Sequence, residues 1–129
     1  MTQLLMKGKR GVIMGLANDH SLAWGISQAL YQHGAELAFT YQTETLQKRL
    51  DPLAKSLGSD LCVPCDVSQP GSIHEAFSKI AERFPSIDFV LHSLAFSDKE
   101  ELKGQYLDTS RSNFLNSLDI SCYSFTEVC

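Results

Sequence analysis

The sequence predicts an α/β fold whose doubly wound parallel sheet has the strand order 3-2-1-4. Two observations predict it. Short apolar runs alternate with segments of helical periodicity along the 129 residues, which is the pattern of repeated strand–helix units. The fourth apolar run, residues 87–91, is apolar almost throughout after Asp88, as in a strand whose two faces are both covered. Right-handed crossovers between such strands produce a parallel sheet.

Strands and helices are expected in regular alternation. Four strands are predicted, at residues 10–15, 36–41, 61–65 and 87–91. The helix after the first strand carries Leu22, Ile26 and Leu30 on one face. It ends at Gly34, a residue type typical of helix C-termini. A polar loop is expected over residues 96–108, before a last helix.

The second and third helices carry start signals. Leucines recur at helical spacing after the second strand, at Leu46, Leu50, Leu53 and Leu57. Asp51 and Pro52 interrupt this stripe and resemble an N-cap and a first helical residue, so two short helices rather than one are expected. Ser72 and Glu75 have the spacing of a capping box, which predicts the start of the third helix.

The last helix, from residue 110 to the chain end, is apolar on more than one side. Such a helix is expected to lie between its own sheet and a second surface, for which a subunit partner is one candidate. The chain stops within this helical pattern, and the fourth strand would leave an open apolar edge. We therefore expect residues 1–129 to be the first part of one Rossmann-like domain that continues beyond them.

The composition is that of a globular domain, with 43% hydrophobic and 20% charged residues. The formal net charge of −4 argues against a nucleic acid or an anionic membrane as the main partner. No segment approaches the roughly 18 apolar residues of a membrane-spanning helix. The N-terminal charge pattern is the reverse of a secretory signal, so a cytoplasmic location is expected.

The four cysteines predict neither a disulfide framework nor a metal site. Cys62 and Cys65 form a C-x-x-C on an expected strand, where residues three apart point to opposite faces. No second ligand pair accompanies them, as a zinc site would require. Cys122 and Cys129 lie two helical turns apart, too far to bridge. All four are expected to be small buried residues in a reducing compartment.

A widened glycine turn follows the first strand. After Gly15 come five residues, then Ser21, Ala23 and Gly25 at alternate positions. A strand that turns into a helix brings backbone N–H groups and the positive end of the helix dipole together, where a phosphate fits. Gly15 permits the turn, and Ala23 and Gly25 are expected to let the helix lie close to the strands. An ordinary strand-to-helix turn with incidental glycines is the alternative.

Four segments at the expected strand ends develop this hypothesis. They are residues 15–25, 34–42, 65–67 and 92–96, which read GLANDHSLAWG, GAELAFTYQ, CDV and HSLAF. In this order, they resemble the bacterial NADH-dependent enoyl-acyl-carrier-protein reductases, a divergent group of short-chain dehydrogenases/reductases. The resemblance covers essentially the whole chain. Ordinary members of that superfamily have a tighter glycine turn and an Asn-Asn-Ala-Gly after the fourth strand, and this chain has neither.

The resemblance implies a reaction, namely hydride transfer from NADH to the trans-2 double bond of an acyl thioester on acyl carrier protein, in fatty-acid elongation. It also implies a catalytic tyrosine and lysine that are expected beyond Cys129, so residues 1–129 alone are expected to be inactive. Tyr41 and Lys48 have the spacing of such a pair. We reject them, because Tyr41 ends the second strand on the side expected for adenosine.

The resemblance implies cofactor-binding roles for eight residues and substrate-side positions for two. The cofactor-binding residues are Gly15, Ser21, Leu22, Gln42, Asp66, Val67, Ser93 and Leu94; the substrate-side residues are Ser97 and Leu102. The first three correspond to pyrophosphate contacts, although the family more often has Ile where this chain has Leu22. Gln42 corresponds to a contact near the adenosine ribose, and Asp66 and Val67 frame the adenine. Ser93 and Leu94 would line the nicotinamide side.

Several of these residues also have purely structural explanations. Asp66 could cap a turn, Ser93 could be a small residue at a crowded strand end, and Gln42 could be solvated. His20 and His92 are more typical of structural than of catalytic histidines here. The joint position of the cofactor-binding residues at the carboxyl ends of four strands favours binding, because open α/β sheets bind ligands beyond those ends.

The charges after the second strand favour NADH over NADPH. No basic residue is available there for a 2′-phosphate, and Glu44 would repel one. The resemblance further implies a homotetramer, with residues 119–124 in an interface helix. Two other functions remain open: another short-chain reductase acting on a ketoacyl or carbonyl substrate, and a catalytically silent dinucleotide-binding fragment.

Overall fold

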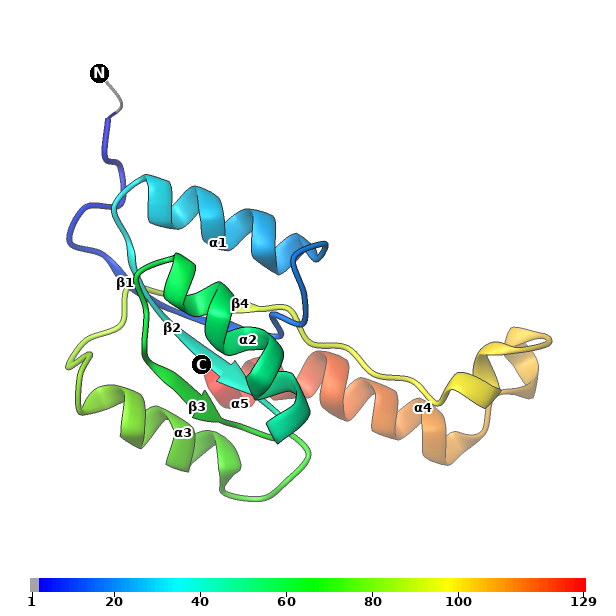
Figure 1. Cartoon of the computed structure of the whole chain (residues 1–129). Helices are drawn as coiled ribbons and strands as arrows, with labels where there is room; N and C mark the ends of the chain where they lie inside the picture. Colours follow the sequence, from blue (N-terminus) through cyan, green and yellow to red (C-terminus); the bar gives the residue numbers. More distant parts are fainter. Residues whose placement is uncertain (1–2) are drawn as a thin grey trace.

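The computed structural model describes residues 3–129 and contains a four-stranded parallel sheet with the order β3-β2-β1-β4 (Figure 1). The strands are β1 (Arg10–Met14), β2 (Glu36–Tyr41), β3 (Cys62–Pro64) and β4 (Phe89–His92). Val12 at the centre of β1 is in register with Ala38 of β2 and Val90 of β4. The predicted fold class and strand order are therefore confirmed, with strand ends shifted by one or two residues.

Helices cover both faces of the sheet. Helices α1 (Leu22–Gln32) and α2 (Glu44–Ser56) lie on one face, and α3 (Ser72–Ala81) lies on the other (Figure 1). Successive residues of β1 therefore enter opposite cores: Val12 and Met14 pack with the α3 side, and Ile13 packs with the α1 and α2 side. All three side chains are fully buried, which explains why β1 shows no polar alternation.

The buried face of α1 differs from the prediction. Ala23 and Ser27 are buried, whereas Leu22 is 85% exposed and Ile26 is 42% exposed. Ser27 can be buried because its hydroxyl donates to the Ala23 carbonyl at 2.7 Å. A Cβ at Gly25 would meet no heavy atom within 4 Å, so the expectation that Gly25 allows close packing is wrong. Ala23 is fully buried, as that role requires.

Helix α2 is one continuous helix, so the expectation of two short helices is wrong. Its N-cap is Thr43, whose hydroxyl accepts a hydrogen bond from the Leu46 N–H. Pro52 lies inside the helix on its exposed side, so the carbonyl that Pro52 leaves without a donor faces solvent. Burial of Leu50 and Ala54 on the other side stabilises the helix across the proline.

The predicted capping box of α3 is also wrong. The N-cap is Gly71, which has a φ of +80° and forms no side-chain cap. The Ser72 hydroxyl instead accepts a hydrogen bond from the Asp66 N–H at 2.8 Å. Glu75 pairs with Lys79 one turn further along. The contact between Ser72 and Asp66 fixes the start of α3 to the end of β3.

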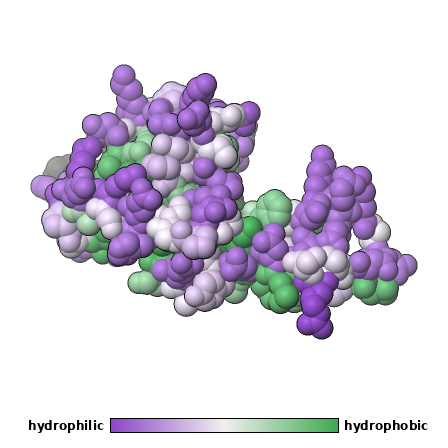
Figure 2. Space-filling view, turned by 90° about the horizontal axis from the view of Figure 1, so that it is seen from below, coloured by the Kyte–Doolittle hydropathy of each residue, from purple (hydrophilic) through white to green (hydrophobic). Residues whose placement is uncertain are grey.

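The yellow and orange segment after β4 forms an arm that projects from the sheet, and the red C-terminal end lies back beside the sheet (Figure 1). The segment expected to be a loop contains two short 3-10 helices, Lys99–Leu102 and Tyr106–Asp108. Next come α4 (Arg111–Leu118), a π-helical turn (Asp119–Tyr123) and α5 (Ser124–Val128), which together form the predicted last helix. Figure 2 shows patches of apolar surface on this arm, mainly where it joins the rest of the molecule, among hydrophilic side chains.

Most apolar side chains of this helix are partly exposed and not buried against the sheet as expected. They are 44–56% exposed, and they are Phe114, Leu115, Leu118, Tyr123 and Phe125. The buried residues of α4 and α5 are instead Asn113 and Ser124. Only the end of α5 packs against the α3-side core, through Val128.

The cysteines are all free thiols, but only part of the expectation for them is confirmed. Cys65 is buried and Cys62 is half-buried, and they pack against opposite cores. Cys122 and Cys129 are exposed, contrary to the prediction. Residues 3–129 contain no cluster of side chains suited to hold a metal ion. None of the helices formed by these residues has the length and apolar character of a membrane-spanning segment.

Candidate functional site

The carboxyl ends of all four strands meet in one cleft. It consists of two adjoining cavities of about 270 and 110 Å³, which share Gln42, Cys65, Leu94 and Ala95 in their linings. Of the eight residues predicted to bind a cofactor, six line the cleft: Gly15, Gln42, Asp66, Val67, Ser93 and Leu94. The topology therefore brings together residues that are up to 79 positions apart in the chain (from Gly15 to Leu94).

The backbone conformation and the close packing at position 15, in the lining of the cleft, both require a glycine. The φ of Gly15 is +90°, a value that residues with a Cβ rarely adopt. A Cβ built there would lie well under 3.0 Å from the Ser93 carbonyl oxygen. The Ser93 N–H donates to the Met14 carbonyl at 3.0 Å, which extends the pairing of β1 and β4 to this point. The glycine turn and the end of β4 are thus in direct contact.

The turn after Gly15 ends at the capped N-terminus of α1. The Ser21 hydroxyl donates to the Asn18 carbonyl at 2.9 Å and accepts from the Trp24 N–H at 3.2 Å. The N–H groups of Leu22 and Ala23, in the first turn of α1, have no partner within the helix. With the helix dipole, they make this end of α1 suited to an anion. Ser21 and Leu22 lie here and not in the lining of the two cavities.

Asp66 is the acidic residue of the cleft. Its Oδ1 accepts from the Ser68 N–H at 3.0 Å and from the Ser68 hydroxyl at 2.6 Å, and its Oδ2 accepts from Gln42 Nε2 at 3.4 Å. Hydrogen bonding from Ser68 lowers the pKa of the Asp66 carboxyl below its ordinary value, and Gln42 adds to the effect. Asp66 therefore both caps the turn after β3 and presents a carboxylate to the cleft.

The cleft has no cationic lining. Neither of its two cavities is lined by Lys or Arg among residues 3–129. An anionic ligand would therefore depend on backbone N–H groups and the α1 dipole for its neutralisation, as in other glycine-turn sites. Glu44, the first residue of α2, lies just beyond Gln42 and adds a negative charge after β2.

The contacts of Tyr41, His92 and His20 give none of them a catalytic arrangement. Tyr41 lines the larger cavity at the end of β2, and burial raises the pKa of its hydroxyl, the opposite of activation by a neighbouring lysine. His92 Nε2 lies 2.7 Å from the Ser124 hydroxyl, and its ring packs edge-on against Phe125. His20 is exposed beside Asp19.

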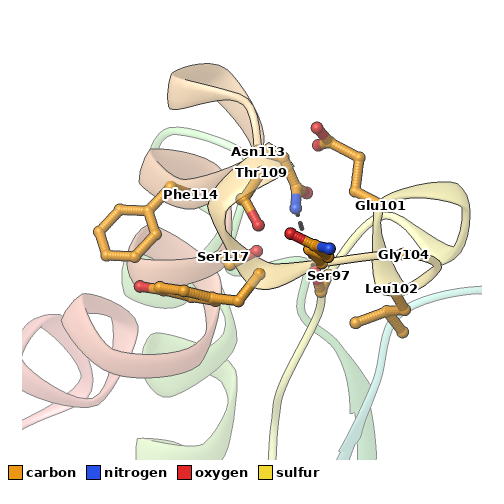
Figure 3. Close-up of a pocket in the computed structure, with 10 residues that line it drawn as sticks. Ser97, Glu101, Leu102, Gly104, Thr109, Asn113, Phe114 and Ser117 are labelled. Atoms are coloured by element: carbon orange, nitrogen blue, oxygen red, sulfur yellow. Dashed lines mark hydrogen bonds between the residues drawn. The ribbon is translucent and has the colours of Figure 1, made fainter.

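A separate cavity of about 370 Å³ lies in the arm and contains both predicted substrate-side residues (Figure 3). Ser97 and Leu102 line it, together with Asn113 and Phe114 of α4. Asn113 Nδ2 donates to the Ser97 hydroxyl at 3.1 Å, the contact drawn as a dashed line in Figure 3. The structure thus places the two substrate-side residues together and outside the cleft.

Sequence reasoning missed some residues of the cleft and of the arm. Thr40, Leu46 and Ala95 line the cleft, and Asn113 and Ser121 bond the segment that leaves β4. Thr40 and Ala95 could have been found, because they lie next to strand ends that were already identified. Asn113 and Ser121 carried no signal of their own, because polar residues on an apolar helix normally face solvent.

Comparison with known proteins places this chain in a family. The family described as enoyl-(acyl carrier protein) reductase has a sequence model that matches residues 15–129. The chain belongs to the enoyl-acyl-carrier-protein reductase family. The resemblance inferred from the strand-end segments is therefore confirmed.

Members of this family are similar to nearly all of this chain. The enoyl-[acyl-carrier-protein] reductase [NADH] 2 of Rhizobium meliloti is 56% identical over 124 residues, which are 96% of this chain and 46% of the relative. The crystal structure of the Anaplasma phagocytophilum reductase in complex with NAD matches with a TM-score of 0.94 and 60% identity, covering 98% of this chain and 48% of that one.

A more distant structure extends the comparison. The Bacillus cereus enoyl-acyl carrier protein reductase, with NADP+ and indole naphthyridinone, has a TM-score of 0.92 and 40% identity over 98% of this chain and 50% of that one. The chain spans about half the length of the curated relatives that it matches.

Proposed function

We propose that this chain is the cofactor-binding part of an NADH-dependent enoyl-acyl-carrier-protein reductase of fatty-acid biosynthesis. The observation that carries the proposal is the cleft at the carboxyl ends of β1–β4, lined by Gly15, Gln42, Asp66 and Ser93. This is where open α/β sheets bind dinucleotides. Bound there, NADH would supply the hydride for reduction of the enoyl double bond.

The residues present fit a dinucleotide from end to end. The Gly15 turn and the first N–H groups of α1, at Ser21 and Leu22, would hold the pyrophosphate. Gln42 would reach the adenosine ribose. Asp66, whose carboxylate stays ionised at neutral pH, would accept from the adenine amino group beside Val67.

The other end of the cofactor would lie at β4. Ser93 and Leu94 would line the nicotinamide, and Ser97 and Leu102 would contact the enoyl substrate from the arm. The catalytic tyrosine and lysine would follow residue 129, in a domain that continues beyond this chain, as the half-length match to the relatives supports. Residues 1–129 alone would then have no activity.

NADH is proposed as the preferred cofactor. The sequence after β2 offers no Lys or Arg to a 2′-phosphate before Lys48, and Glu44 would repel one. The NADP+ complex of the Bacillus cereus relative, which is 40% identical, makes a direct comparison worthwhile. The full-length protein should show a higher kcat/KM with NADH than with NADPH, and equal values would contradict this assignment.

The last helix supports a proposal that several copies of the protein assemble. The exposed apolar residues of α4 and α5 provide a surface for a second copy, and a homotetramer in the cytoplasm is the arrangement that the family resemblance implies. Sedimentation of the full-length protein tests it: a stable monomer would contradict the proposal.

The decisive experiment follows NADH oxidation by the full-length protein. A trans-2-crotonyl thioester is the substrate, and a β-ketoacyl thioester of the same chain length is the matched control. The proposal requires turnover with the enoyl compound and little with the ketoacyl one. The reverse pattern would assign a ketoacyl reductase, and tight NADH binding without turnover of either compound would assign a silent dinucleotide-binding protein.

A further inference from the structure

The side of α4 and α5 that faces the rest of the chain is polar. Asn113 is 9% exposed and Ser124 is 1% exposed, and Ser121 of the π-helical turn is half-buried. Most large apolar residues of the same helix are exposed, and Val128 packs in a core only at the helix end, so burial of apolar surface does not by itself explain how this side packs. The polar side chains must be explained by what they bond.

All three bond the segment that ends or follows β4. The Ser121 hydroxyl accepts from the Phe96 N–H at 2.9 Å and lies 3.3 Å from the Phe96 carbonyl, to which it donates. Asn113 Oδ1 accepts from the Asp98 N–H at 2.9 Å. Ser124 contacts His92 at 2.7 Å. Ser121 thus holds both polar groups of one backbone residue.

Main-chain pairing of this segment with the sheet stops at Ser93, whose N–H donates to Met14. Within residues 3–129, the backbone groups of residues 94–97 form no hydrogen bond to another backbone group. Side chains of the helix therefore decide how the Phe96 peptide is oriented.

Ser121 lies in an irregular part of the helix. The turn Asp119–Tyr123 is π-helical between two α-helical segments. Such turns are rare and occur frequently at functional sites. The Ser124 hydroxyl donates to the Ile120 carbonyl at 2.6 Å, which satisfies a carbonyl within the turn. The irregular turn is thus itself hydrogen-bonded and presents Ser121 to Phe96.

We propose that Ser121 is a positioning residue for the enoyl substrate. It fixes the Phe96 peptide and, through it, the backbone of Ser97, one of the two substrate-side residues. The inference rests on the proposed function and deepens it. Phe96 also lines the smaller cavity of the cleft. Ser93 and Leu94 precede the contact with Ser121, however, and Ser93 is held by β1 and Gly15, so the main effect of Ser121 falls on substrate binding.

The test compares three variants of the full-length protein. Ser121→Ala removes the hydroxyl, and Ser121→Thr keeps it. Ser78→Ala is the matched control, because Ser78 is exposed on α3 and its hydroxyl bonds only the His74 carbonyl of its own helix. For each variant, KM and kcat are measured with a crotonyl thioester, the Kd of NADH by fluorescence titration, and folding by thermal unfolding.

Ser121→Ala should raise KM for the thioester about tenfold, the scale of one or two lost hydrogen bonds. It should leave kcat within about threefold and the Kd of NADH within about twofold, because Ser93, which would line the nicotinamide, is held by β1 and Gly15 and not by Ser121. Ser121→Thr should recover most of the KM. An unchanged KM, an equal loss in Ser121→Thr, or a matching loss of NADH affinity would overturn the proposal.

A second measurement is independent of turnover. Ser121→Ala should accelerate hydrogen–deuterium exchange of the Phe96 amide about tenfold, and Ser78→Ala should not. If the wild-type protein reduces no enoyl thioester, the proposed function fails, and this exchange rate still tests the contact. Unchanged exchange at Phe96 would refute the role of Ser121 directly.

Discussion

Replacement of Gly15 by alanine should disrupt both the fold and the cofactor site. Gly15 has a φ of +90°, and a Cβ there would lie well under 3.0 Å from the Ser93 carbonyl oxygen. That oxygen belongs to the backbone at the end of β4, which cannot rotate away as a flexible side chain could. The substitution must therefore separate the ends of β1 and β4, where the cleft is formed.

The magnitude follows from two costs. A residue with a Cβ in the left-handed region costs about 1–2 kcal/mol. Displacing close-packed backbone to admit an extra methyl group costs about 1–3 kcal/mol. Gly15→Ala should therefore lower the free energy of unfolding by about 2–5 kcal/mol. The Kd of NADH should rise at least about tenfold, because Gly15 and Ser93 both line the cleft.

Gly25→Ala is the matched control in the same glycine pattern. Gly25 is exposed within α1, and a Cβ there meets no heavy atom within 4 Å. Alanine should raise the free energy of unfolding by about 0.5–1 kcal/mol through helix propensity. Urea unfolding and NADH titration of the full-length protein measure both variants. Equal effects of the two substitutions, or an unaltered Gly15→Ala protein, would refute the reasoning.

Four further outcomes are expected. The pKa of Asp66 is lowered in the folded protein, so its carboxylate contributes stability above its unfolded value of 3.8, and this contribution is lost as pH falls through the lowered pKa. In urea unfolding at pH 3–6, the free energy of unfolding should therefore depend less on pH in Asp66→Asn than in the wild-type protein. Burial, with a smaller contribution from the nearby Asp51 carboxylate, raises the pKa of Cys62 to about 12. Cys62 should therefore react with iodoacetamide far more slowly in the native protein than in urea. Peptide mass spectrometry measures both rates, and equal rates would contradict this prediction. Pro52→Ala should raise the free energy of unfolding by about 1–3 kcal/mol, because alanine restores a helical N–H on an exposed side; a destabilised variant in urea unfolding would count against it. Glu44→Lys should raise kcat/KM with NADPH relative to NADH, and an unchanged ratio would separate Glu44 from cofactor choice.

Local patterns were sufficient to predict the sheet and the location of the cleft. The parallel sheet followed from alternating periodicity and right-handed connection, and the strand order followed from the doubly wound fold class that this alternation indicates. Asp66 and Ser93 could be placed together because parallel strands end at the same edge of the sheet. The role of Gly15 followed from its position between strand and helix, where a positive φ is common.

Predictions of burial, capping and helix starts were less successful, because each depended on which group a single side chain contacts. Leu22 was expected inside and is exposed, whereas Ser27 is buried because its hydroxyl bonds within α1. Ser72 has the pattern of a cap, but its hydroxyl bonds Asp66. Pro52 has the pattern of a helix start, but packing of α2 against the sheet outweighs the lost hydrogen bond. In each case, a hydrogen bond or packing contact that the local pattern did not specify was decisive.

The sequence of this family member determined where the strands and helices lie, where the glycine turn lies and which strand ends form the cleft. Hydrophobic periodicity identifies each element from neighbouring residues, and right-handed connections make the strands parallel, so that their carboxyl ends lie at one edge of the sheet. Only the tertiary structure decided that Ser93 lies against Gly15 and that Ser121 bonds both backbone groups of Phe96. Residues 78 and 25 positions apart meet in these contacts (Gly15 with Ser93, and Phe96 with Ser121). Such contacts exist only after the sheet and helices have packed, since unpaired polar groups then acquire partners that no local pattern specifies.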